Sequence, residues 1–189
     1  SIYMIVQMLG IVTAQGLLNV ADPAGYNLFI ISSVLVSVSF APILLSVSPA
    51  PVFQTTKPMT LRRLFKVSPL GFVGMFLLGV VFSALFGMSA IFGAQIGLSL
   101  REISAFVAAI YVGGMVLQYP IGWFSDRMDR RLLIGGLATS GAVIALAGAI
   151  ISGGFAWLLF MAFIIGGVAN PLYSLYLAYT SDFLEIEDM

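Results

Sequence analysis

The chain contains no cysteine and no histidine among its 189 residues. Their absence excludes disulfides and thiol catalysis, and it removes the residues that most often bind zinc and copper. The sequence also lacks a phosphate-binding loop ending in Gly-Lys-Ser/Thr, and it has no nucleophile with a histidine base. We therefore expect no metal, no cofactor and no enzymatic activity.

Charged residues are also scarce, at 8% of the chain, whereas soluble globular proteins average about 25%. Hydrophobic residues make up 60% of the sequence, and its mean hydropathy is +1.09. The formal net charge is zero, so no basic field indicates a nucleic-acid partner. This composition predicts a membrane protein whose main partner is the lipid bilayer.

The few charged positions divide the chain into apolar blocks of about twenty residues, the length that crosses the hydrocarbon core of a membrane. The blocks do not alternate as barrel strands do, and helices are the other structure that satisfies its backbone in lipid. The sequence therefore predicts an all-α, polytopic transmembrane helical bundle. Its six spans are expected near residues 2–20, 26–47, 69–98, 104–124, 132–151 and 155–179.

Two loops, 48–67 and 124–131, hold seven of the eight Lys and Arg residues. Basic residues in short loops stay on the cytoplasmic side of a membrane, so we predict that both loops are cytoplasmic. The first loop contains three prolines and is expected to be a linker. Two interpretations of its later part, 60–67, stay open: a short amphipathic helix at the headgroup level, or a solvated basic loop.

The segment 122–131, GWFSDRMDRR, is a charged cluster between two apolar spans. It resembles the signature loop of the major facilitator superfamily, commonly written G-x-L-a-D-r-x-G-r-[RK]. Phe124 stands at the Leu position, and Asp129 stands where the family usually has a glycine that often adopts a left-handed backbone. The matching residues are Gly122, Asp126, Arg127, Arg130 and Arg131.

The resemblance implies a twelve-helix transporter fold (MFS) in which the six spans are helices five to ten. Residues 1–47 would form the last two helices of the N-terminal bundle, and 48–67 the central cytoplasmic linker. Residues 68–189 would form the first four helices of the C-terminal bundle, and 170–182 resembles the tenth helix of bacterial carriers of this family. We therefore expect an internal fragment of a multi-pass carrier of the plasma (inner) membrane.

The function that this resemblance implies is secondary active transport of a small solute by alternating access, with rocking of two bundles around a midplane site. We favour efflux of a drug or metabolite. None of the six predicted spans contains an ionisable Asp, Glu, Lys or Arg. A carboxylate that couples transport to a proton or another ion would therefore lie elsewhere, or the carrier is a uniporter.

The charged segment is predicted to act as a latch between access states. The resemblance places Asp126 near the start of the fifth helix, close to residue 1. It also pairs Arg127, Arg130 or Arg131 with acidic residues at the end of the tenth helix, where Asp182 and Glu185 stand. The alternative interpretation is that the arginines only orient the chain and that the acids neutralise them.

Neutral polar residues of the spans are the candidates for a solute cavity. Those of the third, fourth and sixth spans are Ser89, Gln95, Tyr111, Gln118, Asn170, Tyr173, Ser174 and Tyr176. The resemblance implies that the third and sixth spans face the central cavity, and Pro171 frees a backbone carbonyl one turn earlier on the sixth. The predicted cavity residues are Gln95, Asn170, Pro171, Tyr173 and Tyr176. Ordinary packing explains the same tyrosines. Phe82 and Phe86 either add an aromatic wall or belong to the core.

Two rival functions stay open at this point. A receptor or assembly scaffold could keep the helical fold without moving a solute, because fold does not fix function. A complete six-helix protein could instead dimerise to form a pore. The solute, the coupling ion, the direction of transport and the oligomeric state have no marker in the sequence.

Overall fold

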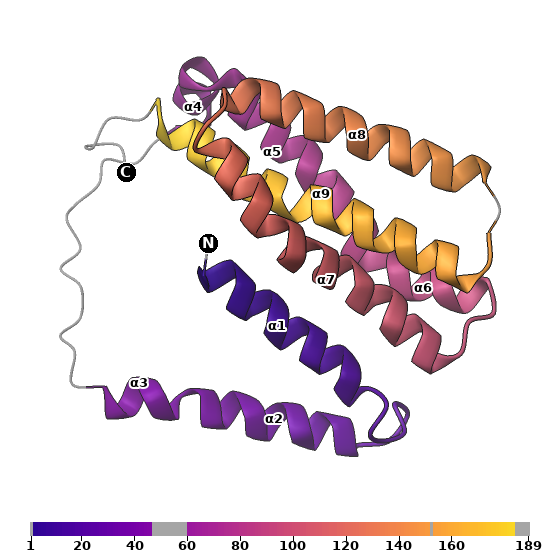
Figure 1. Ribbon diagram of the computed structural model, residues 1–189. Coiled ribbons are helices and arrows are strands. Elements are labelled where there is room, and N and C mark those ends of the chain that lie inside the picture. Colours follow the sequence, from indigo (N-terminus) through magenta and orange to yellow (C-terminus); the bar gives the residue numbers. More distant parts are fainter. Residues whose placement is uncertain (1, 47–59, 152, 184–189) are drawn as a thin grey trace.

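The computed structural model describes residues 2–46, 60–151 and 153–183, and the regular elements in these ranges are helical. Figure 1 shows long helices lying side by side, with their ends at two common levels. The elements are α1 (Ile2–Leu17), α2 (Asn27–Ser39), α3 (Ala41–Leu45), α4 (Leu61–Val67), α5 (Pro69–Phe82), the π-helix η1 (Ser83–Met88), α6 (Ser89–Gln95), α7 (Leu100–Ser125), α8 (Arg130–Ile150) and α9 (Phe155–Ser181).

Four helical stretches in the described part of the chain are long and apolar enough to cross a membrane. They are the continuous path Pro69–Gln95, formed by α5, η1 and α6, and the helices α7, α8 and α9. The first two predicted spans are apolar but shorter. The helical path of the second is interrupted at Phe40, because Pro42 has no N–H to donate and its ring crowds the preceding turn.

The fourth span begins at Leu100, four residues before the predicted start, because a capping box fixes it there. The Ser99 hydroxyl accepts a hydrogen bond from the Glu102 amide at 3.4 Å, and the Ser99 amide donates to the Glu102 carboxylate at 2.9 Å. These bonds satisfy donors that the first helical turn leaves free. Charge at this end of α7 therefore has a structural role in starting the helix.

Helices α7 and α9 cross at very close range through glycines. A Cβ atom on Gly113 would lie 1.8 Å from the Phe163 carbonyl oxygen, and one on Gly166 would lie 2.0 Å from the Ile110 carbonyl oxygen. Such distances leave no room for any side chain, so backbone packs directly on backbone. Membrane helices gain their association energy from this kind of contact, since lipid is as apolar as leucine.

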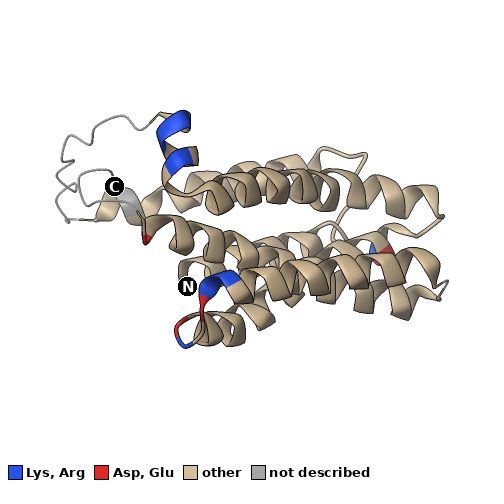
Figure 2. Cartoon of the chain, turned by 90° about the horizontal axis from the view of Figure 1, so that it is seen from above, with Lys and Arg blue, Asp and Glu red and all other residues tan. Residues whose placement is uncertain are grey.

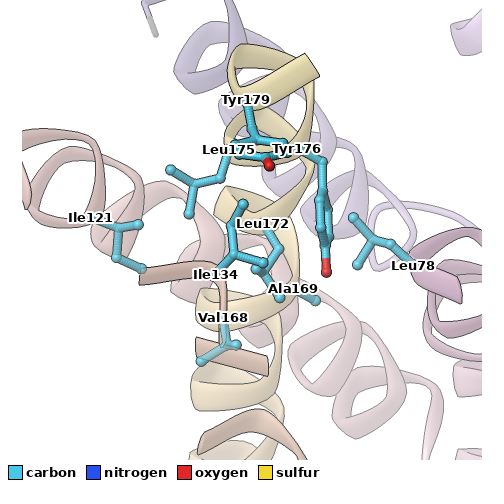
Figure 3. Packing of buried hydrophobic residues seen from close by; sticks show 9 residues of the cluster. All are labelled: Leu78, Ile121, Ile134, Val168, Ala169, Leu172, Leu175, Tyr176 and Tyr179. Carbon is cyan, nitrogen blue, oxygen red and sulfur yellow. The ribbon is translucent and has the colours of Figure 1, made fainter. Parts of the chain in front are cut away.

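The main hydrophobic core surrounds the second half of α9 (Figure 3). α9 contributes most of it, and α5, α7 and α8 each contribute a side chain, so α9 is the central helix of the group. The buried members are Leu78, Ile121, Ile134, Val168, Ala169, Leu172, Leu175, Tyr176 and Tyr179. A smaller cluster of Phe106, Ile110 and Ala162 continues the α7–α9 contact toward the other end.

The described charged residues gather mainly at one end of the long helices, as Figure 2 shows. This end carries α4 and the loop between α7 and α8, whereas Arg101 lies in the first turn of α7, at the opposite end of that helix. α4 is a helix with its basic side chains exposed, and the Thr60 hydroxyl caps its start by accepting from the Arg63 amide. Residues 61–67 are therefore helical, as one of the two interpretations predicted, and a position at the headgroup level stays a prediction.

Candidate functional site

The loop between α7 and α8 is short, and a capping residue stands at each of its ends, Asp126 after α7 and Asp129 before α8. Asp129 is the N-cap of α8, and its carboxylate accepts from the Arg131 amide at 2.8 Å. Its backbone angles, φ −60° and ψ 118°, are those of an ordinary extended conformation. The left-handed turn that the family's usual glycine suggests is therefore not formed here, because an aspartate at this position caps the next helix instead.

Arg130 connects this loop to the end of α9. Its guanidinium forms an ion pair with Asp182, the C-cap residue of α9, and donates to the Ala178 carbonyl at 3.4 Å. It also donates to the Ser125 hydroxyl at 3.3 Å, so it joins the end of α7, the start of α8 and the end of α9. The structure thus brings together two of the residues predicted to pair, whereas Glu185 lies outside the described residues.

Arg131 contacts the same end of α9 through aromatic side chains. Its Nε donates to the Tyr179 hydroxyl at 2.9 Å, and its guanidinium lies 5.6 Å from the Tyr179 ring centroid and 5.8 Å from that of Phe183. Tyr179 and Phe183 were not predicted as partners. Their spacing of four residues, which places them on one face of a helix, was the available indication.

The other two charged residues of the segment behave differently. The Arg127 side chain folds back onto the end of α7. It donates to the Trp123 carbonyl at 3.2 Å, and its guanidinium lies 3.9 Å from the Trp123 ring centroid. Asp126 is the exposed C-cap of α7, and no described residue donates a hydrogen bond to its carboxylate. The predicted contact of Asp126 with residue 1 lies outside the described residues.

Two cavities flank α1, and α9 contributes to both. The first, which we call the aromatic cavity, has a volume of about 900 Å³ and lies among α1, the α5–η1 path, α7 and α9. Phe82, Phe86, Tyr111, Asn170 and Tyr173 line it. A volume of this size suits a drug-sized molecule.

The second, which we call the loop cavity, has a volume of about 480 Å³ and is lined by Ile5 of α1, Gln118 and Asp126 of α7, Arg130, and Ser174 of α9. Gln118 is buried, and its amide nitrogen donates to the Ser174 hydroxyl at 3.0 Å. No described protein group donates to its amide oxygen. Ser174 lines both cavities, so it lies between them.

Two of the predicted cavity residues line the aromatic cavity together. Asn170 is buried, and its side-chain nitrogen donates to the Gly166 carbonyl at 2.9 Å, one turn earlier in α9. Tyr173 follows one turn later, and its ring centroid lies 6.4 Å from that of Phe82. Gln7 of α1 also lines this cavity and was not predicted, because nothing in its apolar segment separates a cavity face from a lipid face.

The other three predicted residues lie elsewhere. Tyr176 is a core residue, and its ring occupies the space that a side chain on Gly74 would need. Pro171 is fully buried and lines the loop cavity. Gln95 is exposed at the last position of α6 and lines neither cavity.

Comparison with known proteins identifies the family. The sequence model of the Major Facilitator Superfamily matches residues 1–187, nearly the whole chain. The chain belongs to the Major Facilitator Superfamily. The resemblance inferred from the 122–131 segment is thus confirmed, as is the helical membrane bundle.

Several bacterial members of this superfamily are similar along most of the chain. An uncharacterized MFS-type transporter of Yersinia enterocolitica, YE1530, is 29% identical over 185 residues, which cover 95% of this chain and 47% of the relative. A Yersinia pestis MFS-type transporter is 24% identical over 182 residues, with the same coverage. YfkF of Bacillus subtilis, also an MFS-type transporter, is 26% identical over 140 residues, or 69% of this chain and 34% of YfkF.

This chain therefore spans about half the length of the Yersinia relatives that it matches. No solved structure matches it. The described geometry ties the 122–131 segment to α9 through Arg130 and Arg131.

Proposed function

We propose that this protein is a secondary active transporter that moves a small solute by alternating access. The observation that carries the proposal is the position of the aromatic cavity. It lies between α1, which precedes the segment 48–67, and the helices α5, α7 and α9, which follow it. A binding site between two groups of helices opens to either side of the membrane when one group rocks against the other.

The proposed domain organisation follows from the same arrangement. Residues 1–47 belong to one bundle, 48–67 form the linker, and 68–189 belong to the second bundle. The coverage of the Yersinia relatives supports a carrier about twice as long as this chain. Sequencing the coding DNA on both sides tests this point, and about four further spans before residue 1 and two after residue 189 are expected.

The orientation is proposed from the position of the basic residues. The end that carries α4 and the α7–α8 loop faces the cytoplasm, and the protein lies in the plasma (inner) membrane. We favour efflux of a drug or metabolite. Coupling to a proton or another ion requires a carboxylate, and the described residues that line the aromatic cavity include no Asp or Glu.

Asp126 is the proposed latch of the access change, and Arg130 is the residue that positions it. The bonds of Arg130 to Asp182 and Ser125 hold the end of α7 against the end of α9. Asp126 then lies in the wall of the loop cavity, which Ile5 of α1 also lines. A contact between Asp126 and the first bundle would form in one access state and break in the other.

Cysteine labelling of the full-length protein in membranes tests the latch. Ser181→Cys places a thiol in the wall of the aromatic cavity, in a protein whose cysteines outside these 189 residues are first replaced by serine; the 189 residues contain none. We expect Asp126→Asn to raise the rate of labelling by an impermeant maleimide from the cytoplasmic side several-fold. Asp129→Asn is the matched control, because Asp129 caps α8 and lies outside the loop cavity.

Equal labelling rates in both variants would reject the latch. Transport itself is tested separately, by solute flux into proteoliposomes that hold the full-length protein. Saturable flux is expected. Its absence from a protein that still binds a solute would favour the receptor or scaffold over the transporter.

A further inference from the structure

The aromatic cavity has a continuous row of rings along one side. The Tyr111 and Phe86 rings stack at 5.0 Å between centroids with an angle of 10° between their planes. Phe82 lies 5.0 Å from Phe86 and 6.4 Å from Tyr173, so the row runs from α7 across the α5–η1 path to α9. Aromatic rings in offset-stacked or tilted pairs at these distances attract each other, and an aromatic solute can form the same kind of pair with an exposed ring face.

The described residues do not fully cover two of these rings. Phe86 is 39% exposed and Tyr173 is 38% exposed, whereas Tyr176 and Tyr179 on the same helix as Tyr173 are buried in the core. Both Phe86 and Tyr173 line the cavity, so the described residues leave ring surface open there. Phe82 packs against the main core, whereas packing explains only part of the surface of Phe86.

The cavity offers hydrogen bonds but no full charge. Among the described residues that line it, none is Asp, Glu, Lys or Arg. Its polar side chains are neutral amides and hydroxyls, of which Gln7, Asn170 and Ser174 are examples. An ion that leaves water for such a site loses its hydration and gains no counter-charge, which costs several kcal/mol in typical cases.

From these two features we propose that the aromatic cavity binds an uncharged, planar aromatic solute, stacked on the Phe86–Tyr111 pair and hydrogen-bonded by the neutral polar groups. The inference rests on the proposed function for its transport role, but the binding step stands apart from it. Ring faces also attract cations, so a planar cation is the competing ligand that the test must include.

Equilibrium binding to the full-length protein in lipid nanodiscs tests the proposal. The neutral probe is N-phenyl-1-naphthylamine, and 1-anilinonaphthalene-8-sulfonate adds an anionic group to the same ring system. Ethidium serves as the planar cation, and empty nanodiscs of the same lipid correct for partition into the bilayer. We expect saturable binding of the neutral probe and at least about tenfold weaker binding of both charged probes, which is about 1.4 kcal/mol.

Matched variants identify the site. Phe86→Leu keeps an apolar side chain but removes the ring, and we expect it to weaken binding of the neutral probe roughly 3- to 10-fold. Phe76→Leu is the control, because Phe76 is exposed on α5 outside this cavity and its loss should leave binding unchanged. The melting temperature of each variant confirms that the protein is folded.

The proposal is overturned if the neutral probe does not bind saturably, if Phe86→Leu binds it as tightly as Phe76→Leu does, or if either charged probe binds more tightly than the neutral one. Flux of the neutral probe into proteoliposomes separates this inference from the proposed function. Saturable binding without flux would reject transport and leave the site intact. Flux of another solute without binding of the neutral probe would reject the site and leave transport intact.

Discussion

The most apolar stretches of helices α8 and α9 have the same mean hydropathy, yet they occupy opposite environments. Half of the most apolar stretch of α9 is buried inside the protein, against 6% of that of α8. Hydropathy reports only that a segment can enter lipid. Small residues alone do not decide which helix becomes central, because α8 holds more Gly and Ala than α9 does. What differs is whether they face a partner helix at close range, since lipid competes equally well for every leucine. α9 carries Gly166, Asn170 and Pro171 in its buried part.

Glycine replacements are expected to show the largest difference in stability between α9 and α8. Gly166→Ala on α9 would place a methyl group 2.0 Å from the Ile110 carbonyl oxygen, so α7 and α9 would have to separate. We expect a loss of stability of roughly 3 kcal/mol or more. The measurement is the melting temperature of the detergent-solubilised protein, followed by size-exclusion chromatography after heating.

Gly136→Ala on α8 is the matched control. A Cβ atom there meets nothing within 4 Å, and alanine favours the helix over glycine by about 1 kcal/mol. The two substitutions should therefore change stability in opposite directions. Equal melting temperatures would show that the α7–α9 crossing is not held by direct backbone contact.

A smaller difference is expected for leucines. Leu172 of α9 is buried in the main core, whereas Leu146 of α8 is 62% exposed. Leu172→Ala should cost about 2–3 kcal/mol through the cavity that it leaves, and Leu146→Ala less than about 0.5 kcal/mol. Thermal unfolding of both variants in the same lipid measures the contrast, and similar losses would mean that another surface covers α8.

The sequence was sufficient to predict the helical class, the family and the four longer spans. Apolar length and the 122–131 segment carry that information locally. The sequence did not predict the break before Pro42 as an interruption, nor the start of α7 at Leu100. The first depends on the missing N–H and the ring of Pro42, and the second on the two hydrogen bonds of a capping box. Average hydropathy contains neither.

The candidate site was predicted in part. Asn170 and Tyr173 lie together in one cavity, but Tyr176, three residues further along, lies in the core. A helix turns by about 100° per residue, so each step of three residues shifts the side chain by about 60° around the axis, and Tyr176 lies about 120° from Asn170. Whether a helix face lies against the core or the cavity depends on which neighbouring helix packs there. For Tyr176 the deciding neighbour is Gly74, about 100 positions earlier in the chain.

The smallest effect concerns the polar groups of the two helices. On α8 the Thr139 hydroxyl donates to the Gly135 carbonyl at 2.8 Å and is satisfied within its own helix. Gln118 of α7 instead reaches across to Ser174 of α9, and no described protein group donates to its amide oxygen. An unpaired buried acceptor costs about 1–3 kcal/mol.

Gln118→Leu removes that acceptor with little change of volume, and it also removes the bond to Ser174, which offsets part of the gain. We expect it to raise the melting temperature, with a net gain of about 1 kcal/mol. Thr139→Val, which removes a locally satisfied hydroxyl, should leave stability within about 0.5 kcal/mol. A lower melting temperature for Gln118→Leu would show that the amide oxygen has a partner in the membrane-embedded protein. The polar side chains between α7 and α9 would then be satisfied, as Thr139 is on α8. The two regions would differ only in how closely their helices pack.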